Sequence, residues 1–142
     1  MNRTLAMAGT LMLLAGLSAC SGEGGAGTPS GTASPTVSDD PAVELEASIV
    51  AYSDAFFAGE GRRAYELLSE RCRALIPQEE FVATVTTFSD LLGDARPQMT
   101  SVQVSSLDDA KATVSYDYDR GDYAQLDEQW VLESGTWHDD HC

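Results

Sequence analysis

The stretch Trp130-Val131-Leu132-Glu133-Ser134-Gly135-Thr136-Trp137 is typical of an antiparallel β-hairpin. Trp130 and Leu132 occupy alternate positions before the Ser-Gly pair, and such a pair forms a two-residue turn between strands. This turn places Leu132 opposite Trp137 and, further along, Trp130 opposite Asp139. We therefore predict a final hairpin with one apolar face.

The residues that precede this hairpin show the same two-residue period. Apolar side chains alternate with polar ones over 102–104, 112–118 and 124–126, and Asp108-Asp109 marks the first turn. An alternating pattern of this kind is typical of antiparallel strands with one buried face. The sequence therefore predicts a sheet of about four antiparallel strands after Pro97.

The register of the middle hairpin depends on the length of its loop. A two-residue turn at Arg120-Gly121 pairs Tyr116 with Gln125, which mixes apolar and polar residues on one face. A three-residue loop, 119–121, instead pairs Tyr116 with Ala124 and Val114 with Leu126, with Gly121 in the left-handed conformation. We predict the second register because it keeps one face apolar.

Upstream of the strands the apolar period is helical. Asp40-Pro41 suits the start of a helix, because Asp caps free N–H groups and Pro is tolerated in the first turn. A second helix is expected over 62–73 and a third between Pro77 and Gly93. The stripe of the first helix consists of Leu45, Ile49, Tyr52 and Phe56, and that of the third of Phe81, Val85, Phe88 and Leu92.

Three helices followed by an antiparallel sheet resemble the nuclear transport factor two-like superfamily. The local resemblance lies in 52–57, 59–61, 64–68 and the 130–137 hairpin. Within that superfamily the chain is similar to short envelope lipoproteins of high-GC Gram-positive bacteria. The resemblance implies an α+β domain over residues 41–142, with three N-terminal helices packed on a curled antiparallel sheet of about four strands. The resemblance further implies that this cystatin-like cone encloses a pocket.

The first twenty residues are typical of a bacterial lipoprotein signal. Arg3 precedes an apolar run over 5–17, which is too short to span a bilayer as a helix, and the run ends in Leu17-Ser18-Ala19-Cys20. We expect cleavage after residue 19 and lipidation of Cys20 with diacylglycerol and palmitate-like acyl chains. The alternative is an ordinary secretory signal with an incidental cysteine.

These expectations divide the chain into three parts. A lipoprotein signal peptide covers 1–19, a lipidated Cys20 begins a tether rich in Gly, Ser, Thr and Pro over 20–40, and the domain follows over 41–142. Two or more acyl chains anchor a protein stably to a bilayer. The predicted location is the extracytoplasmic face of the cell membrane.

The charge of the chain limits the partners that it can take. Its formal net charge is −15, with 23 acidic residues against 8 Lys and Arg. This balance argues against nucleic acid and against electrostatic adhesion to anionic lipid, so the predicted membrane contact is the anchor on Cys20. The pair His138 and His141 with flanking aspartates is a weak metal motif, and we expect neither a metal ion nor another cofactor.

Two further cysteines remain once Cys20 is lipidated. Cys72 and Cys142 form an even pair on the oxidising side of a membrane, so we expect a disulfide between them. The alternative is a reactive Cys142 thiol beside His141. Simple alternation in the last strand points Cys142 away from the helices. Either the chain bends near Asp140 or the predicted register of that strand is wrong by one residue.

Two carboxylates are candidates for the pocket of the cone. The predicted register places Glu128 on the face of Leu126 and Trp130, and Asp139 opposite Trp130. A carboxyl in an apolar pocket has a raised pKa and can serve as general base, with Tyr116 or Tyr118 as hydrogen-bond donor. The predicted pocket-lining residues are Tyr52, Phe56, Tyr116, Tyr118, Trp130 and Trp137. The alternative leaves Glu128 and Asp139 in solvent, at a sheet edge or strand end.

Three functions remain open from the sequence. The first is a non-enzymatic, lipid-anchored module that binds a small apolar ligand or an envelope protein, because the chain has no convergent nucleophile–base motif. The second is a pocket enzyme of the isomerase, dehydratase or cyclase kind, which the resemblance implies, with Glu128, Asp139 and Tyr116 as weak catalytic candidates. The third is a surface interaction protein whose aromatic side chains fill the cone. We expect the first.

Overall fold

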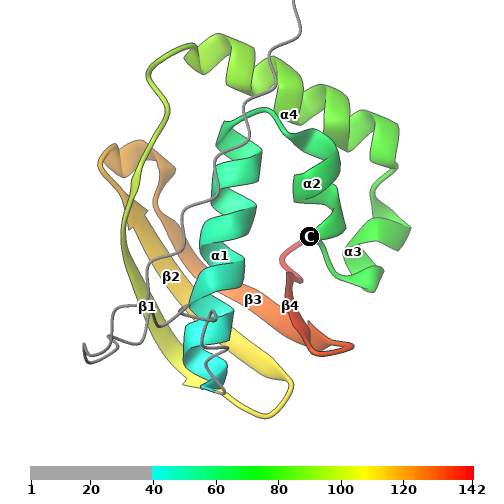
Figure 1. Ribbon diagram of the computed structural model, residues 1–142, viewed down its shortest axis with the longest axis vertical. Helices are drawn as coiled ribbons and strands as arrows, with labels where there is room; N and C mark the ends of the chain where they lie inside the picture. The colour runs from blue at the N-terminus through cyan, green and yellow to red at the C-terminus, as the bar shows by residue number, and fades with distance from the viewer. Residues whose placement is uncertain (1–39) are drawn as a thin grey trace, which may run out of the picture. The chain divides into compact units, whose positions relative to one another are not determined.

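The helices precede the strands, as the change of apolar period predicts. The computed structural model describes residues 40–142, and within this range it contains four helices and one four-stranded antiparallel sheet in the order β1-β2-β3-β4 (Figure 1). The elements are α1 (Pro41–Phe57), α2 (Gly61–Glu66), α3 (Glu70–Leu75), α4 (Gln78–Leu92), β1 (Met99–Leu107), β2 (Lys111–Tyr118), the short 3-10 helix η1 (Gly121–Tyr123), β3 (Gln125–Glu133) and β4 (Thr136–Asp139).

Helix α1 packs across one face of the sheet (Figure 1). It begins as predicted, since the Asp40 side chain accepts a hydrogen bond of 3.0 Å from the Ala42 N–H. Helix α4 also ends as predicted, at Gly93 with a φ of 56°. The core between α1 and the sheet consists of Leu45, Ile49, Phe57, Ala112, Val114, Tyr116, Tyr118, Trp130 and Trp137. The apolar stripes therefore face the core.

The predicted second helix over 62–73 is wrong in its continuity, because two helices replace it. Helix α2 ends at Glu66 and α3 begins at Glu70, with Ser69 as its cap: the Ser69 hydroxyl accepts a 3.1 Å hydrogen bond from the Cys72 N–H. Between them, Leu68 forms a parallel bridge with Asp139 at the end of β4. A backbone pairing with a distant strand thus interrupts the helix, and the capping preference of serine was its local signal.

The final hairpin has the predicted register. Leu132 pairs with Trp137 and Trp130 pairs with Asp139 across β3 and β4. The two turn residues Ser134 and Gly135 both have positive φ, 53° and 84°. Two left-handed residues form the tight turn whose twist matches that of the strands.

The predicted register of the middle hairpin is wrong. Tyr116 pairs with Gln125 rather than Ala124, and Val114 pairs with Glu128 rather than Leu126. Between these two pairs, β2 has one residue, whereas β3 has two, Leu126 and Asp127. Strand β3 therefore contains a bulge. Gly121 does not adopt the left-handed conformation; Asp127 does, with a φ of 55°.

The bulge changes which side chains of β3 face the helices. Asp127 tolerates the left-handed conformation better than most residues, and its N–H donates a 3.1 Å hydrogen bond to the Ser115 hydroxyl. Leu126 turns outward with 69% of its surface exposed, whereas Glu128 turns inward beside Trp130 and is 7% exposed. The expectation that Leu126 and Glu128 share a face is therefore wrong, although Glu128 and Trp130 do.

The sheet is not strongly curled, which corrects the expected cone (Figure 1). The coarser prediction, an α+β domain of N-terminal helices followed by four antiparallel strands, is confirmed. The predicted signal peptide over 1–19, the lipidated Cys20 and most of the 20–40 tether lie outside the described residues. Within the described range, the helices are too short or too polar to cross a membrane.

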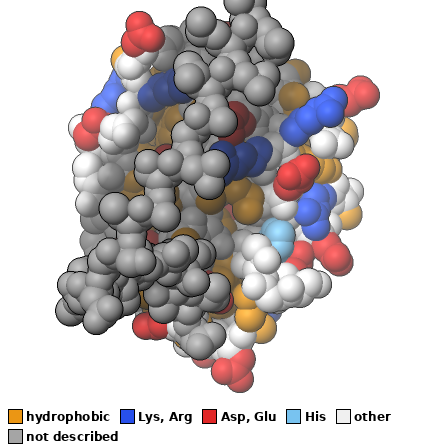
Figure 2. Space-filling model, in the orientation of Figure 1, with side chains coloured by type: hydrophobic (Ala, Val, Ile, Leu, Met, Phe, Trp, Pro, Cys, Tyr) orange, Lys and Arg blue, Asp and Glu red, His pale blue; other side chains and the backbone are white. Residues whose placement is uncertain are grey.

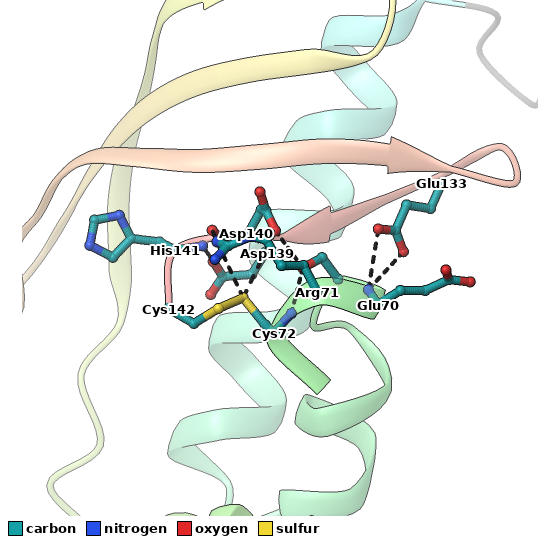
Figure 3. A network of polar contacts seen from close by, with 9 residues as sticks. Glu70, Arg71, Cys72, Glu133, Asp139, Asp140, His141 and Cys142 are labelled. Atoms are coloured by element: carbon teal, nitrogen blue, oxygen red, sulfur yellow. Dashed lines mark hydrogen bonds and ion pairs between the residues drawn. A yellow bond between two sulfur atoms is a disulfide. The ribbon is translucent and has the colours of Figure 1, made fainter. Parts of the chain in front are cut away.

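Strand β4 ends at Asp139, and the Asp140 N–H still donates a 2.8 Å hydrogen bond to the Gln129 carbonyl of β3 before the chain turns toward α3, as the first of the two predicted solutions requires. The backbone of Asp139 bonds to the segment between α2 and α3: its N–H donates to the Leu67 carbonyl (2.9 Å), and its carbonyl accepts from the Ser69 N–H (2.8 Å). Residues 140–142 then run to α3, where Cys142 forms the predicted disulfide with Cys72 (Figure 3).

The visible surface carries charges of both signs. Figure 2 shows Lys and Arg side chains interspersed with Asp and Glu side chains on the side of α2, α3 and α4. Such a mixture is typical of a solvated protein surface.

Candidate functional site

A cavity of about 260 Å³ lies between α1 and the inner face of the sheet. Side chains from α1, from β2, from β3 and from the segment at and after the end of β4 line it. They are Tyr52, Ser53, Phe56, Phe57, Tyr116, Tyr118, Gln125, Glu128, Asp139 and His141. Half of these residues are Tyr or Phe, and the other half carry polar or charged side chains.

Two carboxyl groups lie in this wall, and both are buried. Glu128 is 7% and Asp139 5% exposed. His141 contacts both, because its Nδ1 lies 3.4 Å from the Glu128 Oε2 and its backbone N–H donates a 2.9 Å hydrogen bond to the Asp139 Oδ1. The alternative in which the two carboxylates are in solvent is thus wrong.

Burial changes the protonation of these carboxyls. The pKa of Asp139 rises from 3.8 to about 6. Desolvation by burial is the largest cause, the hydrogen bond from the His141 N–H opposes the rise, and the nearby Glu128 contributes to it. Desolvation also raises the pKa of Glu128, and His141 opposes that rise as well. Asp139 therefore exchanges its proton close to neutral pH.

The tyrosines of the wall stay protonated. Desolvation, followed by the nearby Asp139, raises the pKa of Tyr52 and of Tyr116 far above the ordinary value. The Tyr118 hydroxyl lies 2.8 Å from the Ser53 hydroxyl in a buried hydrogen bond. The Tyr116 hydroxyl has no protein hydrogen-bond partner among residues 40–142, and Tyr116 is only 4% exposed. This hydroxyl is free to bond to a molecule in the cavity.

The arrangement can therefore do two kinds of chemistry. Two buried carboxyls accept hydrogen bonds from a bound molecule, and Asp139 can also exchange a proton with it near neutral pH. The protonated tyrosines supply hydroxyl donors, and their rings supply apolar contact.

The structure brings most of the predicted site residues together. The candidate catalytic residues Glu128, Asp139 and Tyr116 line one cavity, as do the predicted pocket residues Tyr52, Phe56 and Tyr118. The predicted Trp130 and Trp137 instead lie in the closed core, each 1% exposed. Trp130 packs behind the cavity wall in a T-shaped contact with Tyr52, with ring centroids 6.1 Å apart, whereas Trp137 lines a separate pocket with Leu132.

Four lining residues were not predicted: Ser53, Phe57, Gln125 and His141. Ser53 lies four residues after Ile49 and four residues before Phe57, so it shares a helix face with two apolar side chains. A polar residue in such an apolar row was the signal that could have identified it. Gln125 replaces Leu126 in the wall only because of the bulge in β3. No local pattern marks it.

A polar network holds the end of the chain that carries Asp139 and His141 (Figure 3). The Asp140 carboxylate accepts hydrogen bonds from Ser69 (2.5 Å) and from Arg71 Nε (3.0 Å), and the Arg71 guanidinium also bonds to the Asp140 carbonyl. The Cys72–Cys142 disulfide lies beside this network, and His141 points away from it toward the cavity. One wall of the cavity is therefore fastened to α3.

The weak metal motif at His138 and His141 is not part of any group of metal-ligating side chains in the described part of the chain. Across residues 40–142, no three His, Cys, Asp or Glu side chains are arranged to hold a metal ion.

Comparison of the chain with protein-family models and with curated protein sequences found no match.

Proposed function

We propose that this protein is a lipid-anchored, extracytoplasmic binding module that holds a small molecule between α1 and the sheet. The observation that carries the proposal is the cavity of about 260 Å³, in which aromatic walls surround two buried carboxyls and a free tyrosine hydroxyl. Apolar walls with a few placed polar groups are typical of small-molecule sites. The aromatic side chains leave space here, which argues against a filled cone that works only through its surface.

The membrane anchor is supported by the sequence. Leu17-Ser18-Ala19-Cys20 closes an apolar run of lipoprotein type. We also propose membership of the nuclear transport factor two-like superfamily, supported by the order of helices and strands and by the tight Ser134-Gly135 turn. A fold of this kind does not by itself assign an activity.

Replacing the predicted lipid acceptor tests the anchor. We expect Cys20→Ala to release the protein into the medium or to leave it as unprocessed precursor, because the acyl chains supply the membrane affinity. Cell fractionation and intact mass measure this, with Ser21→Ala as the matched control that stays processed and membrane-bound. Stable membrane retention of a processed Cys20→Ala protein contradicts the anchor.

Acid–base catalysis is a second candidate function, favoured by one specific observation. The Asp139 carboxyl, with its pKa of about 6, shares the cavity with Glu128 and with the Tyr116 hydroxyl. A group whose pKa lies near neutral is suited to take a proton from a substrate and return it. An isomerase, dehydratase or cyclase of this kind would use Asp139 or Glu128 as base.

Mass spectrometry of the whole protein, extracted from the membranes of its own host, tests the binding function. We expect the native spectrum to contain an extra mass that disappears on denaturation. Gln125→Phe, which puts a larger side chain at the half-buried rim of the cavity, should lose this mass. An extra mass that persists in Gln125→Phe, or none in the unchanged protein, contradicts binding in this cavity.

The released compound then separates binding from catalysis. The compound is incubated in large excess with the protein. If the protein is a binding module, the compound is recovered chemically unchanged. Conversion of many equivalents, lost in both Asp139→Asn and Glu128→Gln, would instead establish the enzyme.

A further inference from the structure

Resting on the proposed function, we infer that the cavity between α1 and the sheet selects a small protonated amine with an apolar body. In this arrangement Glu128 and Asp139 accept hydrogen bonds from the ammonium group, and the rings of Tyr52, Phe56 and Tyr116 enclose the rest of the molecule.

The charge inside the cavity favours a cation. Glu128 and Asp139 both lie in the wall, and the one basic side chain lining the same cavity is His141, within the described part of the chain. Ionised carboxyls with so little exposed surface are costly unless a positive charge pairs with them. A bound ammonium supplies that charge and an anion adds repulsion, whereas a neutral molecule leaves the two carboxyls with their His141 contacts alone.

The aromatic walls favour an organic cation over a bare ion. Five of the lining residues are Tyr or Phe, and their rings contact one another: the centroids of Tyr52 and Phe56 are 6.1 Å apart, and those of Tyr116 and Tyr118 are 6.0 Å apart. Aromatic faces attract organic cations and pack against apolar carbon. The formal net charge of −15 also draws cations toward the protein.

The polar groups of the cavity favour an ammonium that carries N–H donors. The carboxylates are acceptors, and the side-chain carbonyl of Gln125 adds another in the wall. A quaternary ammonium has no N–H to offer these oxygens, whereas a primary ammonium has three. The free Tyr116 hydroxyl can then donate to a polar group elsewhere on the ligand.

The volume limits the size of the ligand. A protein cavity of about 150 Å³ accepts benzene, and the pockets that take drug-sized ligands have volumes of about 300–1,000 Å³. The cavity here, about 260 Å³, lies between these ranges. It suits one ring or a short branched chain together with its amino group.

Three probes of one shape test the selectivity by calorimetry with the full-length protein. They are 2-phenylethylamine, 2-phenylethanol and phenylacetate, which carry a positive, a neutral and a negative group on the same ring. At about pH 7.5, above the pKa of about 6 of Asp139, that carboxyl is largely ionised. We expect the amine to bind at least about tenfold more tightly than the alcohol, because charge-assisted hydrogen bonds are the stronger kind.

Isosteric variants assign the selectivity to the two carboxyls. Asp139→Asn and Glu128→Gln should each reduce amine affinity by about tenfold or more, and leave alcohol affinity within about twofold. Asp127→Asn is the matched control: it removes the same charge next to Glu128, from an exposed side chain outside the cavity wall. It should leave both affinities unchanged. Circular dichroism confirms that each variant is folded.

The pH dependence adds a readout specific to Asp139. The titratable groups that face Asp139 are Tyr52 from α1, Tyr116 from β2, Glu128 from β3 and His141. Amine affinity should fall as the pH drops through about 6, since protonation of Asp139 removes the negative charge. In Asp139→Asn this fall should be smaller.

The outcomes separate this inference from the proposed function. Equal affinity for the amine and the alcohol, reduced in Gln125→Phe, keeps the binding function and overturns the preference for a cation. Tight binding of Zn²⁺ or Ca²⁺ without amine binding also overturns it. If none of the three probes binds, and the membrane-extracted protein carries a ligand without a basic nitrogen, the preference for an amine is overturned and the binding function stands. If none of the probes binds and the membrane-extracted protein carries no ligand, both proposals fail.

Discussion

The double variant Cys72→Ser/Cys142→Ser is expected to lose about 4 kcal/mol of unfolding free energy, since the disulfide closes a loop with a sequence separation of 70. The chain-entropy model assigns this stabilisation to the unfolded chain, whose freedom the crosslink restricts. Urea denaturation followed by tryptophan fluorescence measures the loss, because Trp130 and Trp137 are both in the core. A loss below about 1 kcal/mol contradicts this role.

The same variant should loosen one wall of the cavity. Cys142 directly follows His141, and the segment after Asp139 is held to α3 by the disulfide and by the Arg71–Asp140 contacts. Faster amide hydrogen exchange at residues 139–141, with unchanged exchange in the core of α1, is the expected result. Reduction of the unmodified protein should reproduce it, which separates loss of the crosslink from any effect of the serines.

Asp139→Asn is expected to stabilise the protein at neutral pH by up to about 3 kcal/mol, because one pKa unit corresponds to about 1.4 kcal/mol. The pKa of Asp139 rises from 3.8 to about 6 on folding, so the folded state holds the proton more strongly than the unfolded state. Ionisation of Asp139 at neutral pH therefore opposes folding. Asparagine keeps an oxygen that accepts the His141 N–H and carries no charge.

The pH profile of stability checks the sign of this effect. In the unmodified protein, the stabilising contribution of Asp139 to the free energy of unfolding is fully present below about pH 4 and is lost as the pH rises through about 6. The Asp139→Asn variant lacks this decline, so its advantage should vanish at low pH. If Asp139→Asn is more stable than the unmodified protein by the same amount from pH 4 to neutral pH, ionisation of Asp139 is not the cause.

The neighbouring residue offers a matched control with the opposite sign. The Asp140 carboxylate accepts hydrogen bonds from Ser69 and Arg71 and is partly exposed, with 26% of its side-chain surface accessible. Asp140→Asn should therefore destabilise the protein, by about 0.2–1 kcal/mol for an ion pair of this exposure. Two aspartates side by side in the sequence are thus expected to have opposite effects on stability.

This contrast connects stability with function. A buried carboxyl that lowers stability at neutral pH is costly to keep, and such groups are concentrated at binding and catalytic sites. Asp139 and Glu128 both line the cavity, whereas Asp140 lies in the network that secures the chain end. A ligand that pairs with the cavity carboxyls should raise the melting temperature, and this rise should be smaller in Asp139→Asn.

Much of the fold was predictable because it follows from local patterns. The start of α1 at Asp40-Pro41, the end of α4 at Gly93 and the Ser134-Gly135 turn each depend on the backbone preferences of one or two residues. The register of β3 with β4 follows from that turn. Asp139 was therefore placed opposite Trp130 correctly from the sequence.

Two errors have a common physical origin. The bulge at Asp127 and the break between α2 and α3 both arise where the backbone bonds to a distant segment, at Ser115 in one case and at Asp139 in the other. Apolar alternation alone favoured Leu126 over Gln125 on the inner face. The bulge instead gives a register in which Glu128 turns inward and Leu126 outward.

The sequence by itself determined the order of helices and strands, the final hairpin and the cysteine pair that closes it onto α3, because these depend on local conformational preferences and on residue chemistry. Only the tertiary structure decided that Glu128 and Asp139 share one cavity with Tyr116 and His141. That meeting depends on the bulge in β3 and on the course of residues 140–142 toward α3, both held by contacts between segments far apart in the chain. The burial that alters the pKa of Asp139 exists only once those segments have packed together.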